Sequence, residues 1–317
     1  MTDSSITILI QTIGKVTLYV PYATIILGTI GALCNVLTFS AKELRQNACA
    51  FYFLCSAVFD LFTLLICGVL RLLVDHYSYV LPNQSEVFCK MRVYLTAVFP
   101  MLSTSCIVLA SVDRCLLTSG SMQWRRWTTI KAAHRLLIIS AIISIVSPSH
   151  MLIYYGFYTL NGVSNICVSR PGVYSTFVSL FLVIWFTLIP YTIMFIASMT
   201  TFAQIRKSKA RVMPFQHQHH RIDRSLIVLM FIQVILSMTL LSMRTAVIGY
   251  QYLTRDISKD SKSRAIESFM SQLGTVMYYI NYAKSFVYVH LQQNRTGIST
   301  STIAASQKRV NGVIPKH

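Results

Sequence analysis

Seven long, mostly apolar stretches constrain this chain more than any other feature of its sequence. A helix needs roughly 20 apolar residues to cross the ~30 Å hydrocarbon core of a bilayer. The stretches cover residues 16–41, 48–73, 89–117, 136–157, 173–205, 225–252 and 268–291. The seventh is the weakest of them, because it contains Lys284. We therefore predict an all-α integral membrane protein, built as a bundle of seven transmembrane helices.

The composition agrees with a membrane protein and argues against a soluble one. Only 12% of the 317 residues are charged and 54% are hydrophobic, whereas soluble domains carry about 25% charged residues. The net charge of +18 is also a property of nucleic-acid binders. However, the basic residues lie in short segments between the apolar stretches, as they do in membrane proteins. We therefore expect the lipid bilayer, and not a nucleic acid, as a partner.

The distribution of Lys and Arg predicts how the chain is oriented in the membrane. With the N-terminus extracellular, the cytoplasmic segments hold 16 basic residues and the outer segments hold eight. Because cytoplasmic loops are enriched in Lys and Arg, we predict an extracellular N-terminus and a cytoplasmic C-terminus. Residues 1–15 then form the extracellular N-terminus, residues 16–291 the helical domain in the plasma membrane, and residues 292–317 a flexible cytoplasmic tail.

Charged residues within the stretches are candidates for function, because a charge at the bilayer centre costs ~2.5–3.5 kcal/mol. Asp60 lies near the middle of the second stretch and Lys284 lies in the seventh. Lys284 either extends its stem to a membrane interface or points inward and pairs with Asp60. Asp113 and Arg114 close the third stretch, either as an interfacial pair that only ends the helix or as a functional pair.

Other short patterns in the sequence bear on topology and packing. The eight cysteines include no CxxC pair, so no metal site is predicted. Asn83 begins an Asn-x-Ser glycosylation sequon in the predicted first outer loop. Asn294 begins another, which this topology places in the cytoplasm and leaves unmodified. Gly28 and Ala32 are spaced as a small-xxx-small pair, which indicates a close helix contact.

Short motifs, in a fixed order along the chain, resemble those of rhodopsin-like (class A) G-protein-coupled receptors. The matching residues are Gly31, Asn35 and Val36 in the first stretch, Asp60 and Leu61 in the second, Cys89, Asp113, Arg114 and Cys115 in the third, Cys167 in the second outer loop, and Pro190 in the fifth. The spacing of 25 residues from Cys89 to Arg114 matches the family pattern. The resemblance covers roughly residues 16–291 and fits a divergent invertebrate peptide-type receptor.

The sequence departs from this family in the motifs of activation. The fourth stretch lacks the family's tryptophan, and Ile235 and Ser237 stand where the sixth usually has tryptophan and proline. In the seventh stretch Ser285 and Phe286 replace an Asn-Pro pair, and Cys115 replaces the tyrosine after Asp113-Arg114. These departures concern the activation switch rather than the fold.

The resemblance implies roles for residues at three levels of the bundle. Cys89 and Cys167 would form a disulfide that ties the second outer loop to the third helix. Arg114 would be held by Asp113 at rest and released to a heterotrimeric G protein on activation. The positions of the family's sodium site are taken by Asp60, Ser103, Asn281 and Ser285. We expect the ammonium group of Lys284 to replace the sodium ion there.

The resemblance also limits the class of ligand. Aminergic receptors have an aspartate where Thr96 stands, and opsins have the retinal-binding lysine where Tyr279 stands. We therefore expect neither an amine ligand nor retinal, and no other cofactor. The predicted ligand-pocket residues are Arg71, Arg92, Thr96, Arg244 and Tyr279. Such a basic, aromatic pocket suits an extracellular peptide or an anionic small molecule, although these residue types also form belts at membrane interfaces.

The function that this resemblance implies is a receptor that signals from an extracellular ligand to G proteins. Serines and threonines crowd the tail and, once phosphorylated, would suit arrestin; a plain flexible tail fits them equally well. A membrane transporter or channel is the alternative, and ion flux without a G protein would support it. An enzyme is not expected, because the ionisable residues of the stretches are not spaced as catalytic pairs.

Overall fold

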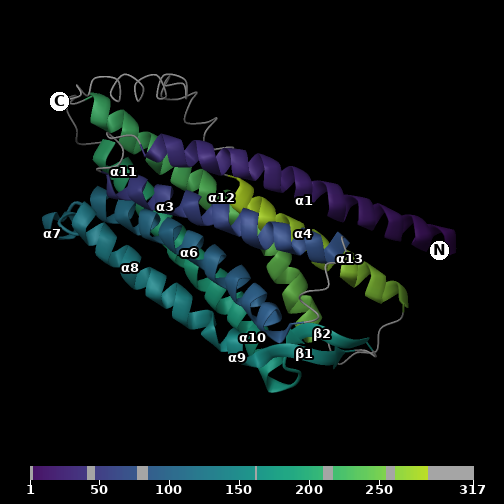
Figure 1. Cartoon of the computed structure of the whole chain (residues 1–317). Coiled ribbons are helices and arrows are strands. Elements are labelled where there is room, and N and C mark those ends of the chain that lie inside the picture. The colour runs from purple at the N-terminus through teal and green to yellow at the C-terminus, as the bar shows by residue number, and fades with distance from the viewer. Residues whose placement is uncertain are drawn as a thin grey trace, which may run out of the picture.

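The computed structural model describes residues 3–40, 47–76, 85–160, 163–209, 217–254 and 261–284. It is an elongated bundle of long helices with one short β-hairpin toward one end (Figure 1). Within the described residues, six helical segments are long and apolar enough to cross a membrane. They are Gly14–Phe39, Ala48–Val74, Glu86–Thr118, Ile130–Tyr154, Val173–Arg206 and Met230–Leu253. The chain is therefore a mainly helical, multi-pass membrane protein.

The elements follow the order of the predicted apolar stretches. The helices are α1 (Asp3–Phe39), α3 (Ala48–Phe62), η1 (Thr63–Gly68), α4 (Val69–His76), α6 (Glu86–Thr118), α7 (Met122–Arg125), α8 (Ile130–Val146), η2 (Ser147–Ser149), α9 (His150–Tyr154), α10 (Val173–Val183), η3 (Ile184–Leu188), α11 (Ile189–Lys209), α12 (His217–Leu253) and α13 (Ser261–Ala283). The second, fourth and fifth stretches are thus each composed of several consecutive helical segments. The strands are β1 (Tyr155–Leu160) and β2 (Val163–Ser169).

The helices agree with the predicted all-α membrane protein, and a short β-hairpin accompanies them. β1 and β2 pair in antiparallel register, with Phe157 opposite Cys167. The fourth stretch was predicted to stay helical as far as residue 157, but its helix ends at Tyr154 and begins earlier than predicted, at Ile130. Asn-Gly at residues 161–162 separates two runs rich in aromatic and β-branched residues, which is a strong hairpin signal. The hairpin was not predicted, because the number of apolar residues in a stretch does not reveal a turn.

The N-terminal segment is helical from Asp3 onward, where α1 begins. That residues 1–15 are extracellular remains a prediction. The long helix carries its N-terminal end toward the same end of the bundle as the hairpin, while α7 lies at the opposite end (Figure 1). The hairpin end therefore corresponds to the predicted outer side, and the α7 end to the predicted inner side; the two ends of the bundle are called outer and inner in this sense.

Two wide helical turns change which residues face the interior. η3 is a π-helical turn that ends at Leu188, two residues before Pro190. Proline has no N–H group and its ring would clash with the carbonyl four residues earlier, so the wider turn accommodates it. η1 is a second π-helical turn, which ends at Gly68. Each extra residue in such a turn rotates the rest of the helix by about 100°, so η1 decides the direction of Arg71.

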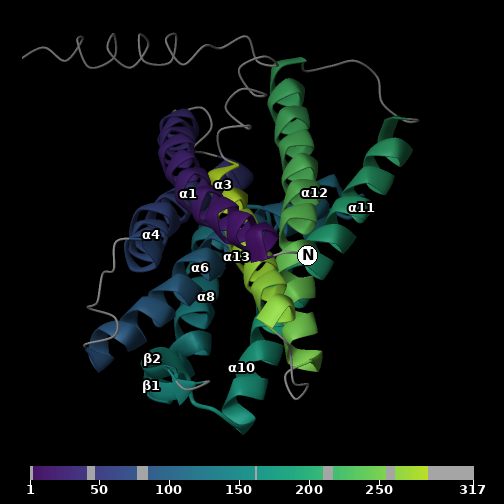
Figure 2. The ribbon, with the colours of Figure 1, turned by 90° about the vertical axis from the view of Figure 1, so that its right-hand side faces the viewer.

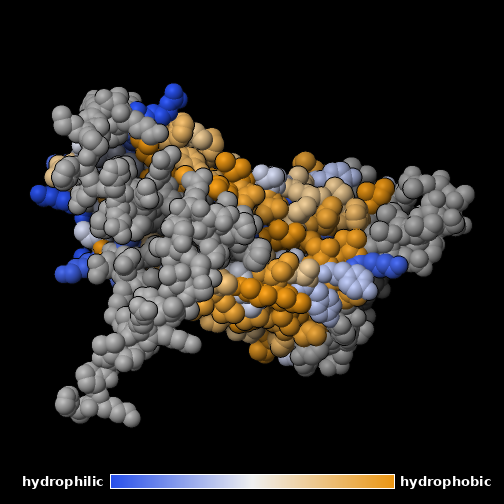
Figure 3. Space-filling view, turned by 90° about the horizontal axis from the view of Figure 1, so that it is seen from above, coloured by the Kyte–Doolittle hydropathy of each residue, from blue (hydrophilic) through white to orange (hydrophobic). Residues whose placement is uncertain are grey.

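The outside of the bundle is apolar along its middle. Large apolar side chains such as Ile138, Ile142, Phe195 and Ile235 are exposed there, the last of them by 62%. The hydrophobic residues cover the central part of the surface, and the strongly hydrophilic ones lie toward its ends (Figure 3). So large an apolar surface is unfavourable in water, so this band is expected to face lipid.

α13, the predicted seventh span, differs from the other long helices. Its described part is 23 residues long but is not among the six segments that are apolar enough to span. It packs between α1 and α12 (Figure 2), and a Cβ atom added to Gly28 of α1 would lie 2.6 Å from Cβ of Ala283. Because neighbouring helices cover it, α13 tolerates more polar residues than a lipid-facing helix. The seventh crossing remains a prediction.

Candidate functional site

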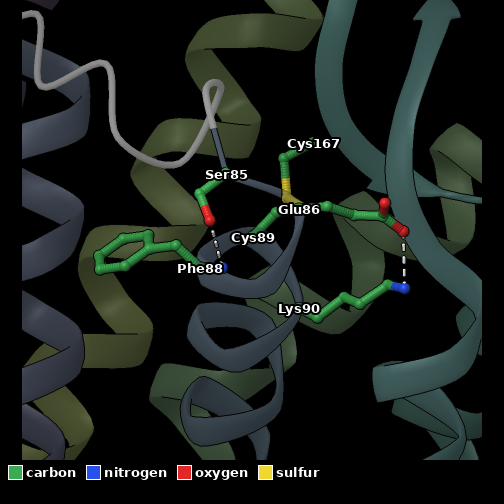
Figure 4. The surroundings of a disulfide bond; sticks show 6 residues. All are labelled: Ser85, Glu86, Phe88, Cys89, Lys90 and Cys167. Carbon is green, nitrogen blue, oxygen red and sulfur yellow. Dashed lines mark hydrogen bonds and ion pairs between the residues drawn. A yellow bond between two sulfur atoms is a disulfide. The ribbon is translucent and has the colours of Figure 1, made fainter.

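A disulfide bond fixes the hairpin over the outer end of the bundle. Cys89, in the first turn of α6, is bonded to Cys167 of β2, and their Cα atoms are 5.8 Å apart (Figure 4). Phe157 of β1 pairs with Cys167 across the hairpin, so the bond holds both strands. The predicted disulfide is confirmed.

The beginning of α6 is held in place by local polar contacts around this disulfide (Figure 4). The Ser85 hydroxyl caps the helix by accepting a hydrogen bond from the backbone N–H of Phe88, at 3.4 Å. The next residue, Glu86, forms an ion pair at 2.6 Å with Lys90, which lies one turn further along α6. A capping serine satisfies an N–H group that the helix itself cannot. The start of α6 is thereby fixed next to the hairpin.

A cavity of about 410 Å³ lies between the hairpin and the outer halves of the helices. All five residues predicted to form a ligand pocket line it: Arg71, Arg92, Thr96, Arg244 and Tyr279. They come from four different helices, α4, α6, α12 and α13. Pockets for small ligands usually measure about 300–1,000 Å³, so this cavity has the size of a ligand site. That these residues bind a ligand remains a prediction.

Arg244, one of the three cavity arginines, is held by two contacts with α13. Its guanidinium group donates a hydrogen bond to the Thr275 hydroxyl, at 3.0 Å, and lies 4.6 Å from the centre of the Tyr278 ring. Gly274 lets the two helices approach, because a Cβ atom there would lie 3.2 Å from Cα of Arg244. These contacts tie α12 to α13 at the level of the cavity.

The hairpin contributes residues to the cavity that the sequence analysis missed. Tyr155 and Ser169 both line it. Burial raises the pKa of Tyr155 to about 12, although the nearby Arg92 and a hydrogen bond with Ser169 lower it. The Tyr155 hydroxyl therefore stays protonated at neutral pH and offers a hydrogen-bond donor to the cavity.

Three tyrosines of α13 line the cavity. Only Tyr279 was predicted from the sequence. Tyr278 and Tyr282 line the cavity with it, and the rings of Tyr278 and Tyr282 are 5.1 Å apart, edge to face. Tyr279 donates a hydrogen bond to the carbonyl of Cys67 in η1, at 3.3 Å. The spacing of Tyr278 and Tyr282 by four residues on one helix is a signal that could have identified them.

A second, smaller cavity lies in the middle of the bundle. It has a volume of about 10 Å³, and Asp60, Ser103, Asn281, Ser237 and Lys284 are among its lining residues. A space of this size and polarity suits a single water molecule or ion. Three of the four predicted sodium-site positions thus lie together, while the fourth, Ser285, lies outside the described residues.

Lys284 is buried and points into this central cavity. Its ammonium group donates hydrogen bonds to the Ser237 hydroxyl and to Oδ1 of Asn281, the latter at 2.7 Å. On the other side of the cavity, the Ser103 hydroxyl donates a hydrogen bond to Asp60, at 2.5 Å. Lys284 therefore does not extend to an interface, and Ser237, which stands in the place of the family's proline, is a partner that the sequence analysis missed.

At the inner end of α6, the predicted switch pair is buried. Arg114 is 2% exposed and Asp113 7% exposed, and the two form an ion pair at 3.0 Å. Nη2 of Arg114 also donates a hydrogen bond to Oδ1 of Asn47, at 2.6 Å. The same Oδ1 caps α3 by accepting from the N–H of Cys49. The pair thus faces the interior of the bundle, and Asn47 is a third member that was not predicted from the sequence.

Some predicted features lie outside the described residues. They are the glycosylation sequon at Asn83, Ser285, and the tail from residue 292 onward. These features remain predictions.

The fold and these three polar sites define a multi-pass membrane protein with an outer cavity, a central polar cluster and a buried inner ion pair. Comparison of the sequence with protein-family models and with curated proteins finds no match. The residues of the three sites are therefore what points to a function.

Proposed function

We propose that this protein is a plasma-membrane receptor of the rhodopsin-like kind, which binds an extracellular ligand and activates a heterotrimeric G protein. The motifs of the sequence support this proposal, and so does the placement of the residues that carry them. The ligand is a peptide or a small molecule. Arrestin is a further partner that the tail residues would suit.

The observation that carries the proposal is the arrangement of sites along α6. This one helix bears Arg92 and Thr96 at the outer cavity, Ser103 at the central cluster, and Asp113 with Arg114 at the inner end. A receptor needs such a mechanical link between a site for a ligand and a site for an intracellular partner.

The proposed mechanism is a change between two arrangements of the inner ion pair. At rest, Arg114 stays bound to Asp113 and to Asn47, which joins the inner ends of α6 and α3. A ligand in the outer cavity favours an arrangement in which the helices move apart and Arg114 becomes accessible to the G protein. A ligand shifts such an equilibrium only through its different affinity for the two states.

The test measures G-protein activation in cells that express the full chain, against a library of peptides and small molecules. We expect at least one ligand to activate signalling, and Arg114→Ala to abolish that response at equal surface expression. Alanine removes both contacts that Nη2 of Arg114 makes, with Asp113 and with Asn47, and it removes the charge that would meet the G protein.

Arg135→Ala is the matched control, since Arg135 is an exposed arginine toward the same end of the bundle. We expect this variant to signal as the wild type does. A full response from Arg114→Ala would refute the proposed role of this arginine. Ion flux through the protein in liposomes, with no ligand that activates a G protein, would favour the transporter or channel instead.

A further inference from the structure

The outer cavity contains three positive charges that are costly in a membrane protein. Arg71, Arg92 and Arg244 all lie within membrane-spanning segments and all line the same cavity. All three charges act electrostatically on the Tyr279 hydroxyl, which lines the cavity with them. No Asp or Glu occurs among the described residues that line this cavity. Charges inside a membrane protein that face a cavity mark the path or site of a ligand.

The rest of the lining is mostly aromatic and aliphatic. Met151, Leu182, Phe186, Leu241 and Ile248 belong to this part of the wall. A ligand that satisfies both parts has one acidic group for the arginines and an apolar body for the remaining surface. Guanidinium groups bind carboxylates through two parallel hydrogen bonds, which gives such a head group a defined position.

From these observations we propose that the outer cavity binds an organic acid through its carboxylate, held by Arg71, Arg92 and Arg244, with an apolar body against the apolar part of the lining. The free carboxyl end of a peptide and an aliphatic acid share this chemistry. The cavity of about 410 Å³ accommodates a small molecule or the end of a peptide rather than a folded partner. This inference names the ligand class of the receptor, and to that extent it rests on the proposed function.

The position of Arg244 connects acid binding to the helices. Its guanidinium group bridges α12 to Thr275 and Tyr278 of α13. A carboxylate that binds Arg244 competes with these two contacts. Two turns further inward on the same helices, Ser237 and Lys284 form the next polar link between α12 and α13. Acid binding would therefore alter the packing of these two helices.

The test measures binding to the full chain, purified and reconstituted in lipid nanodiscs, by isothermal titration calorimetry. The probes are N-acetylphenylalanine and its uncharged amide, for a peptide terminus, and decanoate and decanamide, for an aliphatic acid. At least one acid should bind about tenfold or more tightly than its amide, since a charged hydrogen bond contributes ~1.5–3 kcal/mol. The pair that shows this difference identifies the source of the carboxylate.

Substitutions then locate the site. Arg92→Gln and Arg244→Gln should each weaken acid binding by about tenfold or more and leave amide binding unchanged. Arg170→Gln is the matched control, because Arg170 is exposed toward the same end of the bundle and is not among the described lining residues. If a Gln variant does not fold, Arg92→Lys or Arg244→Lys keeps the charge and should show a smaller loss.

Equal affinity for acids and amides, no detectable binding of either acid, or an equal loss in Arg170→Gln would overturn the acid site. Failure of the receptor function is a separate result. If acid binding depends on the arginines but no ligand activates a G protein, the acid site is supported and the receptor function is refuted. If a ligand activates the G protein equally well in Arg92→Gln and Arg244→Gln, the receptor function is supported and the acid site is refuted.

Discussion

At the scale of single residues, Lys284 places an ammonium group in the small central cavity, where the proposed receptor family would hold a sodium ion. Lys284→Met keeps the length of the side chain but removes its charge and its hydrogen bonds to Ser237 and Asn281. Removing one partner from a buried charged cluster costs ~3–5 kcal/mol. We expect a clearly lower thermal unfolding temperature of the purified protein.

Lys90→Met provides the control for this prediction, because Lys90 forms only a partly exposed ion pair with Glu86. Such pairs contribute ~0–1 kcal/mol, so stability should change little. The sodium dependence gives the second measurement. Sodium in place of choline should stabilise Lys284→Met, whose central cavity has lost its cation, but not the wild type. A wild type that sodium strongly stabilises would show that Lys284 does not replace the ion.

The order of motifs predicted which residues would meet, but not all of their partners. Asp60, Ser103 and Asn281 line one cavity, as the family pattern implied. The sequence analysis did not foresee that Asn47 would contact Arg114, or that Ser237 would contact Lys284. Both partners are neutral polar residues without a motif of their own. Their contacts depend on helix rotation and on distances between helices, which a pattern along one chain does not contain.

At the scale of elements, the contact of α1 with α13 has a clear test at Gly28. A Cβ atom at this position would lie 2.6 Å from Cβ of Ala283 and 2.7 Å from Cδ1 of Leu64. Because Ala283 belongs to the α13 helix and cannot move independently, Gly28→Ala should separate the two helices. Overpacking of this kind costs ~1–3 kcal/mol, measured as a lower unfolding temperature in detergent.

Gly14→Ala on the same helix is the control and should not lower the stability of the protein. A Cβ atom at Gly14 meets nothing within 4 Å, and alanine favours a helix over glycine by about 0.5–1 kcal/mol. We expect unchanged or slightly higher stability. If Gly28→Ala were as stable as Gly14→Ala, α1 would not pack closely on α13. The small-residue spacing of Gly28 and Ala32 had indicated a close contact on this face but could not identify α13 as the neighbour.

The apolar helices were predictable as elements because length and composition are properties of the chain itself. The exceptions have specific physical causes. The hairpin from Tyr155 to Ser169 depends on strand pairing and on the Cys89–Cys167 bond, neither of which contributes to an apolar count. The π-helical turn at Thr63–Gly68 changes the rotation of the following residues without changing the composition. The direction of Arg71 therefore could not be read from its position in the stretch.

At the scale of the whole molecule, the number of membrane crossings determines whether a receptor is feasible. Six described segments are apolar enough to cross, and an even number of crossings would leave both chain ends on one side. The seventh crossing depends on α13, whose described part begins with charged residues such as Arg264 and Glu267. Both precede residue 268, where the predicted span begins, and Arg264 is exposed, so these charges do not have to enter the bilayer.

Seven crossings predict that the two chain ends lie on opposite sides of the membrane. Epitope tags at both ends should show the N-terminal tag on intact cells and the C-terminal tag only after permeabilisation. The two sequons provide an independent measurement, since only an outer asparagine meets the glycosylation machinery. Asn83→Gln should abolish a glycan-dependent shift in gel mobility, while Asn294→Gln should leave it unchanged. Tags on the same side, or a glycan at Asn294, would contradict seven crossings, and an N-terminal tag that is hidden on intact cells would place Asp113 and Arg114 on the side opposite to a G protein.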